Sequence, residues 1–263
     1  MGDLAQEGVP GQAPTMQKGE ILLEARGLSK GFPGVWEHLI LDRLDFDVRA
    51  GEVHTLLGEN GAGKTVIANI LSGYYDKTEG EILIRGKPVD LTSPRDGLAH
   101  GIAMVHQELM LVPAFTVAQN VMVGLNAPAL SFGLAEVERR LDELVAHYGL
   151  KVDPRARVED LSAGEQQRVE ILKVLFHEPQ VLLLDEPYRA MDALTKQIMH
   201  EALLETYDRT GVTIFFITHD LEEAIFLGDK VHIVTTRPCQ LKKTVEVKIP
   251  RPRSYETQSS EDF

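Results

Sequence analysis

An eight-residue glycine-rich segment, GENGAGKT from Gly58 to Thr65, constrains the fold of this chain more than any other feature. It has the spacing G-x-x-x-x-G-K-[ST] and lies between an apolar run, Val53–Leu57, and a helix-like segment, Val66–Leu71. Glycines let the backbone curl so that successive N–H groups point at phosphate oxygens. A surface turn beside a structural lysine is the alternative, but strand, loop and helix follow in the order that a phosphate-binding loop requires. The segment therefore predicts binding of a nucleoside triphosphate.

Each part of this loop has an expected contact. Lys64 should reach the β- and γ-phosphates, and the helix that begins beside it adds the positive end of its dipole. The Thr65 hydroxyl is placed to ligate Mg²⁺. The predicted nucleotide contacts of the loop are Gly58, Glu59, Asn60, Gly61, Ala62, Gly63, Lys64, Thr65 and Val66.

Two acids follow a second apolar run, Val181–Leu184. A buried strand delivers such acids to the carboxyl edge of a sheet, where ligands bind in open α/β folds. Asp185 would hold Mg²⁺ directly or through water, and Glu186 is placed to orient or deprotonate the attacking water. A strand that merely ends in solvated acids is a common alternative. Because the same chain contains a phosphate-binding loop, we favour the catalytic interpretation of the two acids.

The length and charge of the chain limit the function further. Its 263 residues suit one large domain or a core with a subdomain. The net charge of −13 argues against broad nucleic-acid binding, which needs a basic footprint. The single cysteine, Cys239, is expected to be a tolerated surface or turn residue rather than a nucleophile. No apolar run approaches the roughly 18 to 20 residues that cross a bilayer, and the first residues lack a signal core.

Short alternating apolar segments begin the chain. Ile21–Ala25, Leu44–Val48 and Glu81–Arg85 are predicted strands of a small antiparallel layer, the last of which ends at a turn over Gly86–Pro88. Residues 1–19 are small, polar and rich in proline and glycine, so a flexible arm is expected there.

From about residue 92 to 178 the pattern becomes helical, as in Val137–Tyr148 and Glu165–Phe176. Thr213–Thr218, like the run before the two acids, is typical of a parallel strand buried on both faces. The helical part therefore appears as an insertion between two parts of an α/β core. Residues 251–263 are predicted to be a flexible tail.

A third motif indicates the family. Residues 161–165, LSAGE, followed by QQR, resemble the signature motif of ATP-binding cassette (ABC) ATPases, usually LSGGQ, with Ala163 and Glu165 as departures. Ser162 stands where a helix begins, so its hydroxyl and the free N–H groups can bind a γ-phosphate. A plain S-x-x-E helix cap fits the same residues, and both roles can coexist. The resemblance implies nucleotide contacts from Ser162, Gly164 and Glu165.

The remaining family landmarks follow in order. Gln107 resembles the glutamine that senses the metal and the attacking water in this family, and whose loop faces the membrane partner. His219 resembles the switch histidine, which contacts the γ-phosphate, and residues 190–192 resemble the D-loop. The resemblance implies a catalytic set of Glu186, His219, Gln107 and Lys64, and a metal set of Thr65, Gln107 and Asp185.

The adenine contact and the other histidines are less constrained. Family members stack the base on an aromatic residue upstream of the phosphate loop; Phe32 is the expected contact and Trp36 the second candidate. Either ring could instead pack against the small β layer. His54 and His106 are expected to be structural, because no metal-ligand spacing links the histidines.

The resemblance covers roughly residues 20–250 and implies an α/β fold. This fold is a P-loop NTPase (ABC ATPase) with a RecA-like core, an antiparallel β subdomain and an inserted helical subdomain. The implied cofactors are ATP and Mg²⁺. ATP on one cassette would be covered by the signature residues of a second, identical or different cassette. Hydrolysis would drive a separate transmembrane permease, served indirectly by a periplasmic or extracellular solute-binding protein, from the cytoplasmic face of the membrane.

The class of transporter and its cargo leave alternatives open. Residues 20–175 are most similar to monosaccharide or nucleoside importer ATPases, and residues 178–253 to nitrate, sulfonate and taurine importer ATPases, so the chain resembles a mosaic. An importer of a small polar solute is the interpretation we favour. A soluble ABC ATPase for translation or DNA repair usually has tandem cassettes or a coiled-coil insertion. Intact catalytic residues disfavour a regulatory cassette, and exporter ATPases are generally fused to membrane helices.

Overall fold

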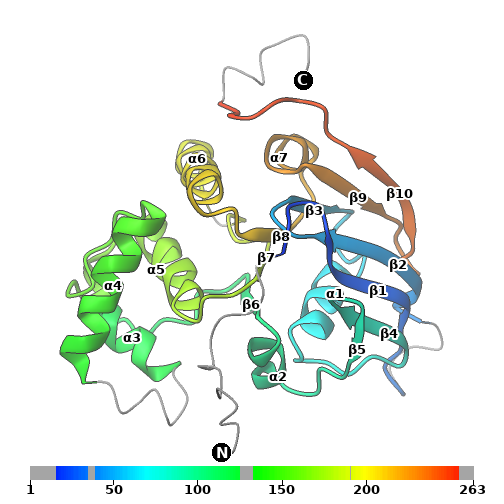
Figure 1. The fold of residues 1–263 in the computed structure, drawn as a ribbon, viewed down its shortest axis with the longest axis horizontal. Coiled ribbons are helices and arrows are strands. Elements are labelled where there is room, and N and C mark those ends of the chain that lie inside the picture. Colours follow the sequence, from blue (N-terminus) through cyan, green and yellow to red (C-terminus); the bar gives the residue numbers. More distant parts are fainter. Residues whose placement is uncertain (1–15, 35–38, 125–132, 190, 255–263) are drawn as a thin grey trace, which may run out of the picture.

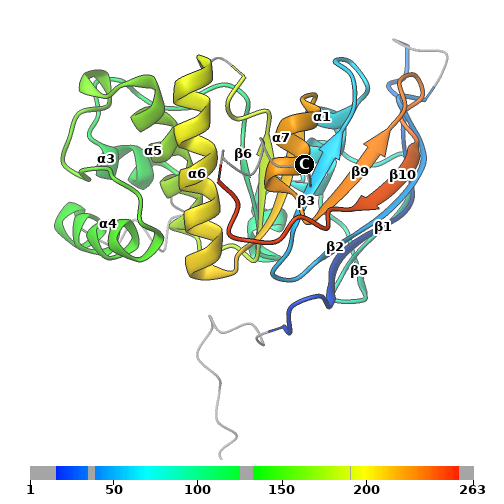
Figure 2. The same cartoon turned by 90° about the horizontal axis from the view of Figure 1, so that it is seen from above.

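The structure, a computed structural model, describes residues 16–34, 39–124, 133–189 and 191–254. These residues form two sheets on one side and a group of helices on the other (Figure 1). Helix α6 stands between the two parts when the molecule is seen from above (Figure 2). This arrangement confirms the expected P-loop NTPase class with a separate antiparallel sheet and helical part.

The larger sheet places the functional motifs at one edge. Its strand order is β10-β9-β3-β8-β7-β6, with all neighbours parallel except the β9–β10 pair. Parallel strands end at the same edge, so the phosphate loop, the two acids and His219 leave the sheet at that edge. The strands are β3 (Val53–Leu57), β6 (Ile102–Val105), β7 (Val181–Asp185), β8 (Thr213–Thr218), β9 (Lys230–Val234) and β10 (Leu241–Glu246).

The smaller sheet is fully antiparallel, as predicted, in the order β2-β1-β4-β5. The predicted turn over Gly86–Pro88 is wrong: the turn is Arg85–Gly86, with φ of 52° and 71°, and Lys87 and Pro88 belong to the next strand. That strand lies at the edge of the sheet, where a proline is tolerated. The strands are β1 (Ile21–Lys30), β2 (Leu41–Arg49), β4 (Glu79–Ile84) and β5 (Lys87–Val89).

The helices fall into two groups. Helices α3, α4 and α5 pack on one another to one side of the sheets, with α5 also against β6, and share a core that includes Val121, Leu141 and Leu172 (Figure 1). The others lie against or beside the larger sheet. The helices are α1 (Lys64–Leu71), α2 (Pro94–Ala99), α3 (Val117–Val123), α4 (Leu134–Tyr148), α5 (Ala163–Leu175), α6 (Ala193–Thr210) and α7 (Leu221–Leu227), with a 3₁₀ turn at Val158–Asp160.

The predicted extent of the helical part, about 92–178, needs correction. Strand β6 lies within that range, yet it pairs in parallel with β7 and forms the end of the larger sheet. A buried apolar run of four residues cannot be distinguished from a helical segment by periodicity alone. The separate helical group therefore follows β6.

Described residues of the predicted arm and of the predicted tail pack against the rest of the molecule. Lys18, in the predicted arm, donates a hydrogen bond to the Tyr207 hydroxyl at 3.2 Å. Arg251, in the predicted tail, stacks its guanidinium on the Tyr207 ring at 4.4 Å and pairs with Asp229 at 2.9 Å. The buried Arg253 guanidinium donates to the backbone carbonyls of Ile225, Phe226, Gly228 and Ile249. The tail prediction is therefore wrong for residues 251–254; the remaining tail and residues 1–15 lie outside the described residues.

Cys239 is buried, and the prediction of a surface residue is wrong. Its side chain is fully buried, and its backbone bridges that of Leu41. Its Cβ lies 3.3 Å from the position that a side chain on Gly63 would occupy, so it packs beneath the phosphate loop. Burial raises the pKa of its thiol to about 12. A neutral, buried thiol agrees with the expectation that Cys239 is not a nucleophile.

Two histidines form a buried pair in the larger sheet. His54 on β3 and His232 on β9 stack with ring centroids 5.2 Å apart, and their Nδ1 and Nε2 atoms lie 2.9 Å apart. His232 Nδ1 is 2.9 Å from the Thr244 hydroxyl on β10. Burial, helped by the neighbouring His54, lowers the pKa of His232 to about 3. The pair joins three strands, which is the structural role expected for His54.

This pair predicts a loss of stability in mild acid. The unfolded chain binds a proton at His232 near pH 6.5, whereas the folded chain does so only near pH 3. The contribution of the neutral His232 to the free energy of unfolding is thus fully present above pH 6.5. Below that pH the free energy of unfolding should fall by about 1.4 kcal/mol per pH unit. Urea unfolding at pH 7.5 and 5.5 measures this loss, which should be smaller in His232→Gln. The exposed His100→Gln control should behave like the wild type; equal losses in all three proteins would contradict the assignment.

Candidate functional site

The phosphate loop has the backbone geometry that its sequence predicts. Gly61 and Gly63 have φ of 77° and 101°, a region that residues with a side chain rarely adopt. A Cβ on Gly63 would also lie 3.1 Å from side-chain atoms of Ile40 and Leu41. Helix α1 begins at the next residue, so the loop and the first turn of the helix lie on the same cavity. Anions bind favourably at such a helix start.

Lys64 lies across this loop. Its ammonium donates to the backbone carbonyls of Gly58 at 2.8 Å and Glu59 at 3.0 Å. It also lies 3.3 Å from Glu186 Oε1, and its side chain is only 4% exposed. A buried ammonium held between loop carbonyls and a carboxylate is positioned to act on a charged ligand in the cavity.

Asp185 and Thr65 fit the expected magnesium site. Asp185 is 1% exposed, and its Oδ1 has no hydrogen-bond partner among the described residues. Burial raises its pKa, although a hydrogen bond with Thr65 acts in the opposite direction. A buried, unpartnered carboxylate oxygen beside a hydroxyl is an unfavourable arrangement unless another group satisfies it. A hard divalent cation, which prefers oxygen ligands, would do so.

Glu186 is surrounded by cationic or protonatable side chains. Its Oε1 lies 3.3 Å from both Lys64 Nζ and His219 Nδ1, and its Oε2 lies 3.6 Å from Arg189 Nη1. The residue is 9% exposed and has a positive φ of 42°. Non-glycine residues in that region are strained, and such strain is concentrated at functional sites. The carboxylate is thus fixed where β7 ends.

One cavity of about 390 Å³ gathers most of these groups. The structure therefore unites the phosphate loop with Gln107 and Glu186, which the sequence placed in the site. Arg189 and Ile40 also line it and were not predicted; an arginine three residues after a catalytic acid was the available signal for Arg189. The lining residues are Ile40, Asn60, Gly61, Gly63, Lys64, Thr65, Val66, Gln107, Glu186 and Arg189.

The signature residues lie outside this cavity. Ser162 and Glu165 form a reciprocal cap on α5: the Glu165 carboxylate accepts from the Ser162 N–H at 2.9 Å and from its hydroxyl at 2.6 Å. These hydrogen bonds lower the pKa of Glu165. The predicted helix cap is thus confirmed. Ser162, Gly164 and Glu165 do not line the cavity of their own chain, so their nucleotide contacts stay a prediction.

The adenine and D-loop predictions also stay open. Phe32 packs edge-on against Tyr75 with centroids 5.6 Å apart, and Lys30 Nζ lies 4.8 Å from its ring centre. Phe32 does not line the cavity. Trp36 and Ala190 lie outside the described residues, whereas Asp192 caps α6 by accepting from backbone N–H groups.

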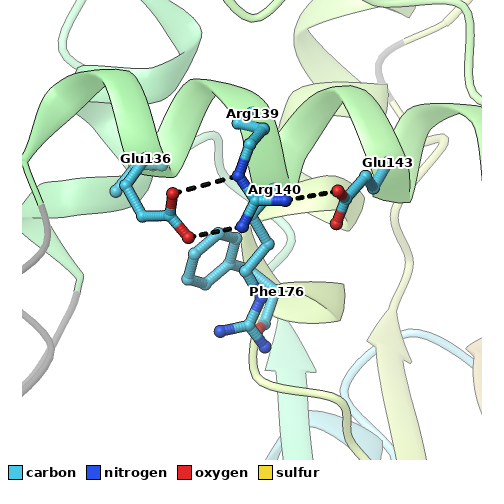
Figure 3. A pocket seen from close by; sticks show the side chains of 6 residues that line it. Glu136, Arg139, Arg140, Glu143 and Phe176 are labelled. Carbon is cyan, nitrogen blue, oxygen red and sulfur yellow. Dashed lines mark hydrogen bonds and ion pairs between the residues drawn. The ribbon is translucent and has the colours of Figure 1, made fainter.

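A second cavity, of about 280 Å³ on α4, differs in its chemistry (Figure 3). Arg139 is paired with Glu136 and Glu143 at 2.5 Å, and Arg140 stacks on Phe176 at 4.5 Å. Arg140 also pairs with Glu178 at 2.7 Å, so both arginines of this cavity are balanced by neighbouring carboxylates. At the larger cavity, by contrast, Glu186 Oε2 lacks a hydrogen-bond partner among the described residues, as does Oδ1 of the adjacent Asp185. We therefore take the larger cavity as the functional site.

The comparison with protein families agrees with this site. The model of the ABC transporter family matches residues 41–189, more than half of the 263 residues. The chain belongs to the ABC transporter family. The matched range includes the phosphate loop, Gln107, the signature segment and both acids. ATP-binding proteins of this family are ATPases.

Two relatives of this ABC chain are named as import ATP-binding proteins. It is 38% identical to the glucose import ATP-binding protein TsgD13 of Haloferax volcanii, over 82% of this chain and 44% of that protein. It is 42% identical to the ribose import ATP-binding protein RbsA 1 of Rubrobacter xylanophilus, over 81% of this chain and 42% of that protein. The chain thus spans less than half the length of these relatives.

Solved structures show the same fold. The structure of cbiO1 from Clostridium perfringens, part of the ABC transporter complex cbiONQ, has a TM-score of 0.74 at 27% identity, covering 87% of this chain and 90% of that one. An ATP-binding cassette of an ABC transporter in its ADP conformation has a TM-score of 0.75 at 22% identity, over 92% and 99% of the two chains. No helix in the described part of the ABC chain is long and apolar enough to cross a membrane.

Proposed function

We propose that this chain is the ATP-binding and ATP-hydrolysing subunit of an ABC importer that takes up a small polar solute through a separate permease. The observation that carries the proposal is the convergence of Lys64, Glu186 and His219, with Asp185 beside them, at the cavity formed by the phosphate loop. The import proteins among the relatives support uptake, and their names favour a sugar over nitrate, sulfonate or taurine as cargo.

Each residue of the site has a separate role in phosphoryl transfer. Lys64 and the loop N–H groups bind the phosphates and offset the charge that develops on the transferred group. Thr65 and Asp185, with Gln107 from the same cavity, would hold Mg²⁺, which would supply positive charge to the phosphates when bound. Glu186 orients the attacking water and accepts its proton. His219, 3.3 Å from Glu186, holds that carboxylate in place.

A second cassette completes the site in this proposal. Ser162 and Gly164 stand at the start of α5, outside the cavity of their own chain, and the exposed Ser162 would meet the phosphates bound by another cassette. Two bound ATP molecules would then join two identical or different cassettes, and hydrolysis would separate them. Closure excludes water and completes the catalytic set. We assign the adenine contact to Phe32 or Trp36.

The permease contact is proposed for the segment after Gln107. Leu109, Met110, Val112 and Phe115 are large apolar residues with 38–58% of their surface exposed. Contiguous exposed apolar residues mark interaction sites. A cytoplasmic helix of the permease packed on this segment would place the chain on the cytoplasmic face of the membrane and transmit cassette closure to the transport pathway. A solute-binding protein would deliver cargo from the other side.

A detergent pull-down of this chain from its native membranes, followed by mass spectrometry, tests the importer assignment. A sugar-type permease in the captured complex is the expected result. A sulfonate- or nitrate-type permease would show that residues 178–253 indicate the cargo better than the rest of the chain does. Capture of ribosomal or DNA-repair components without any permease would overturn the importer proposal in favour of a soluble ABC ATPase.

A further inference from the structure

Arg189 is a second cation at the phosphate-loop cavity, and the functions assigned so far do not use it. It lies in the turn that follows β7, where its backbone N–H donates to the Glu186 carbonyl at 3.2 Å. This turn carries its side chain to the cavity lined by the phosphate loop. Among the described lining residues, Lys64 and Arg189 are the two with a permanent positive charge. Both therefore face any anion that enters.

The two cations flank one carboxylate. Lys64 Nζ is 3.3 Å from Glu186 Oε1, whereas Arg189 Nη1 is 3.6 Å from Glu186 Oε2. The 3.6 Å separation is an ion pair without a hydrogen bond, and that oxygen has no hydrogen-bond partner among the described residues. The Arg189 side chain is 50% exposed. Its guanidinium is thus loosely held and retains donors for another partner.

The position of Arg189 indicates which part of a nucleotide it meets. Lys64, which should reach the β- and γ-phosphates, lies against the same carboxylate from the other side. Glu186 is the group assigned to the attacking water, and attack occurs at the terminal phosphorus. A guanidinium beside Glu186 therefore lies near the terminal phosphate rather than near the base. Its planar donors match the paired oxygens of a phosphate.

We propose that Arg189 is a nucleotide-sensing residue that transfers from Glu186 to the terminal phosphate of ATP. ATP offers the guanidinium a more highly charged acceptor than one carboxylate, whereas ADP lacks the terminal group. Binding of ATP would also free Glu186 Oε2 for the attacking water. Arg189 thus makes the cavity favour the triphosphate over the diphosphate. This inference rests on the proposed ATPase site.

Calorimetric titration of the full chain with Mg²⁺ and either the β,γ-imido analogue of ATP or ADP tests this inference. In Arg189→Ala, the affinity for the analogue should fall roughly tenfold or more, as expected for loss of a charge-assisted hydrogen bond. The affinity for ADP should stay within twofold of the wild type. Arg189→Lys should retain part of the preference, because it keeps the charge but not the planar donors.

Arg139→Ala is the matched control. That arginine is also exposed and paired with carboxylates, but it lies on α4 in the second cavity. It should leave both affinities unchanged. Equal losses for the analogue and ADP in Arg189→Ala, or no loss for either, would overturn the proposed sensing role. Failure of the wild type to bind either nucleotide would instead overturn the proposed function, so the two failures are distinguishable. Thermal unfolding confirms that each variant is folded.

Discussion

Replacement of Glu186 by glutamine is expected to lower the rate of ATP hydrolysis by roughly a hundred- to ten-thousand-fold, the usual contribution of a positioned general base. Glutamine has the same shape and keeps a carbonyl oxygen that can face Lys64 and His219, each 3.3 Å from the present Oε1. It cannot accept a proton from water at neutral pH. Binding of ATP should therefore persist while turnover is lost.

Steady-state phosphate release and equilibrium binding of ATP separate these two effects for Glu186→Gln. Glu143→Gln is a suitable control, because this exposed carboxylate on α4 loses a charge without touching the phosphate-loop cavity. The control should hydrolyse ATP at the wild-type rate. A Glu186→Gln protein with the wild-type rate would show that another group accepts the proton.

Replacement of Lys64 by methionine is expected to impair both binding and hydrolysis. Methionine fills similar space but removes the only ammonium on the lining among the described residues. Loss of charge-assisted contacts to phosphate should weaken ATP binding roughly tenfold to a hundredfold. Loss of charge stabilisation in the transition state should lower the rate by about a further hundredfold or more.

The Lys64 variant needs two comparisons. Lys64 is a buried partner of Glu186. Its removal leaves the buried negative charge of Glu186 with one positive neighbour fewer, which can lower the stability of the folded chain. Lys64→Arg keeps the positive charge, and thermal unfolding of both variants separates misfolding from loss of function. Lys77→Met, which breaks the exposed pair with Asp90, is the control for removing a lysine. Unchanged ATP binding by a folded Lys64→Met protein would contradict the assigned role.

Local sequence signals were sufficient where one segment determines its own structure. Strands β3 and β8 have the predicted bounds, because each is a short, buried and mostly apolar run between turn residues. The helix cap at Ser162 and Glu165 was predictable for a similar reason: both partners lie within one turn. The motif spacing also predicted the phosphate loop, in which Gly61 and Gly63 adopt positive φ.

Other features depend on segments that are distant in sequence. Strand β6 is identifiable only through its pairing with β7. Cys239 is buried because its backbone bridges Leu41, almost two hundred residues earlier, a contact that no local pattern reveals. In the sequence, Arg253 resembles part of a basic, proline-containing tail. In the structure, its guanidinium donates to backbone carbonyls at the end of α7 and just after it. The position of Arg189 at the cavity likewise depends on the folded sheet, which places the end of β7 beside the phosphate loop.

The contacts of Tyr207 bring the two ends of the folded domain together. Lys18 donates to its hydroxyl, and Arg251 lies against its ring. Chain ends that meet at one side chain can be joined by a short linker, and a closed chain can be reopened at an exposed loop. This ABC domain is therefore suited to circular permutation, whereas shortening it to residue 250 would remove the two guanidinium groups that donate to backbone carbonyls at the end of α7.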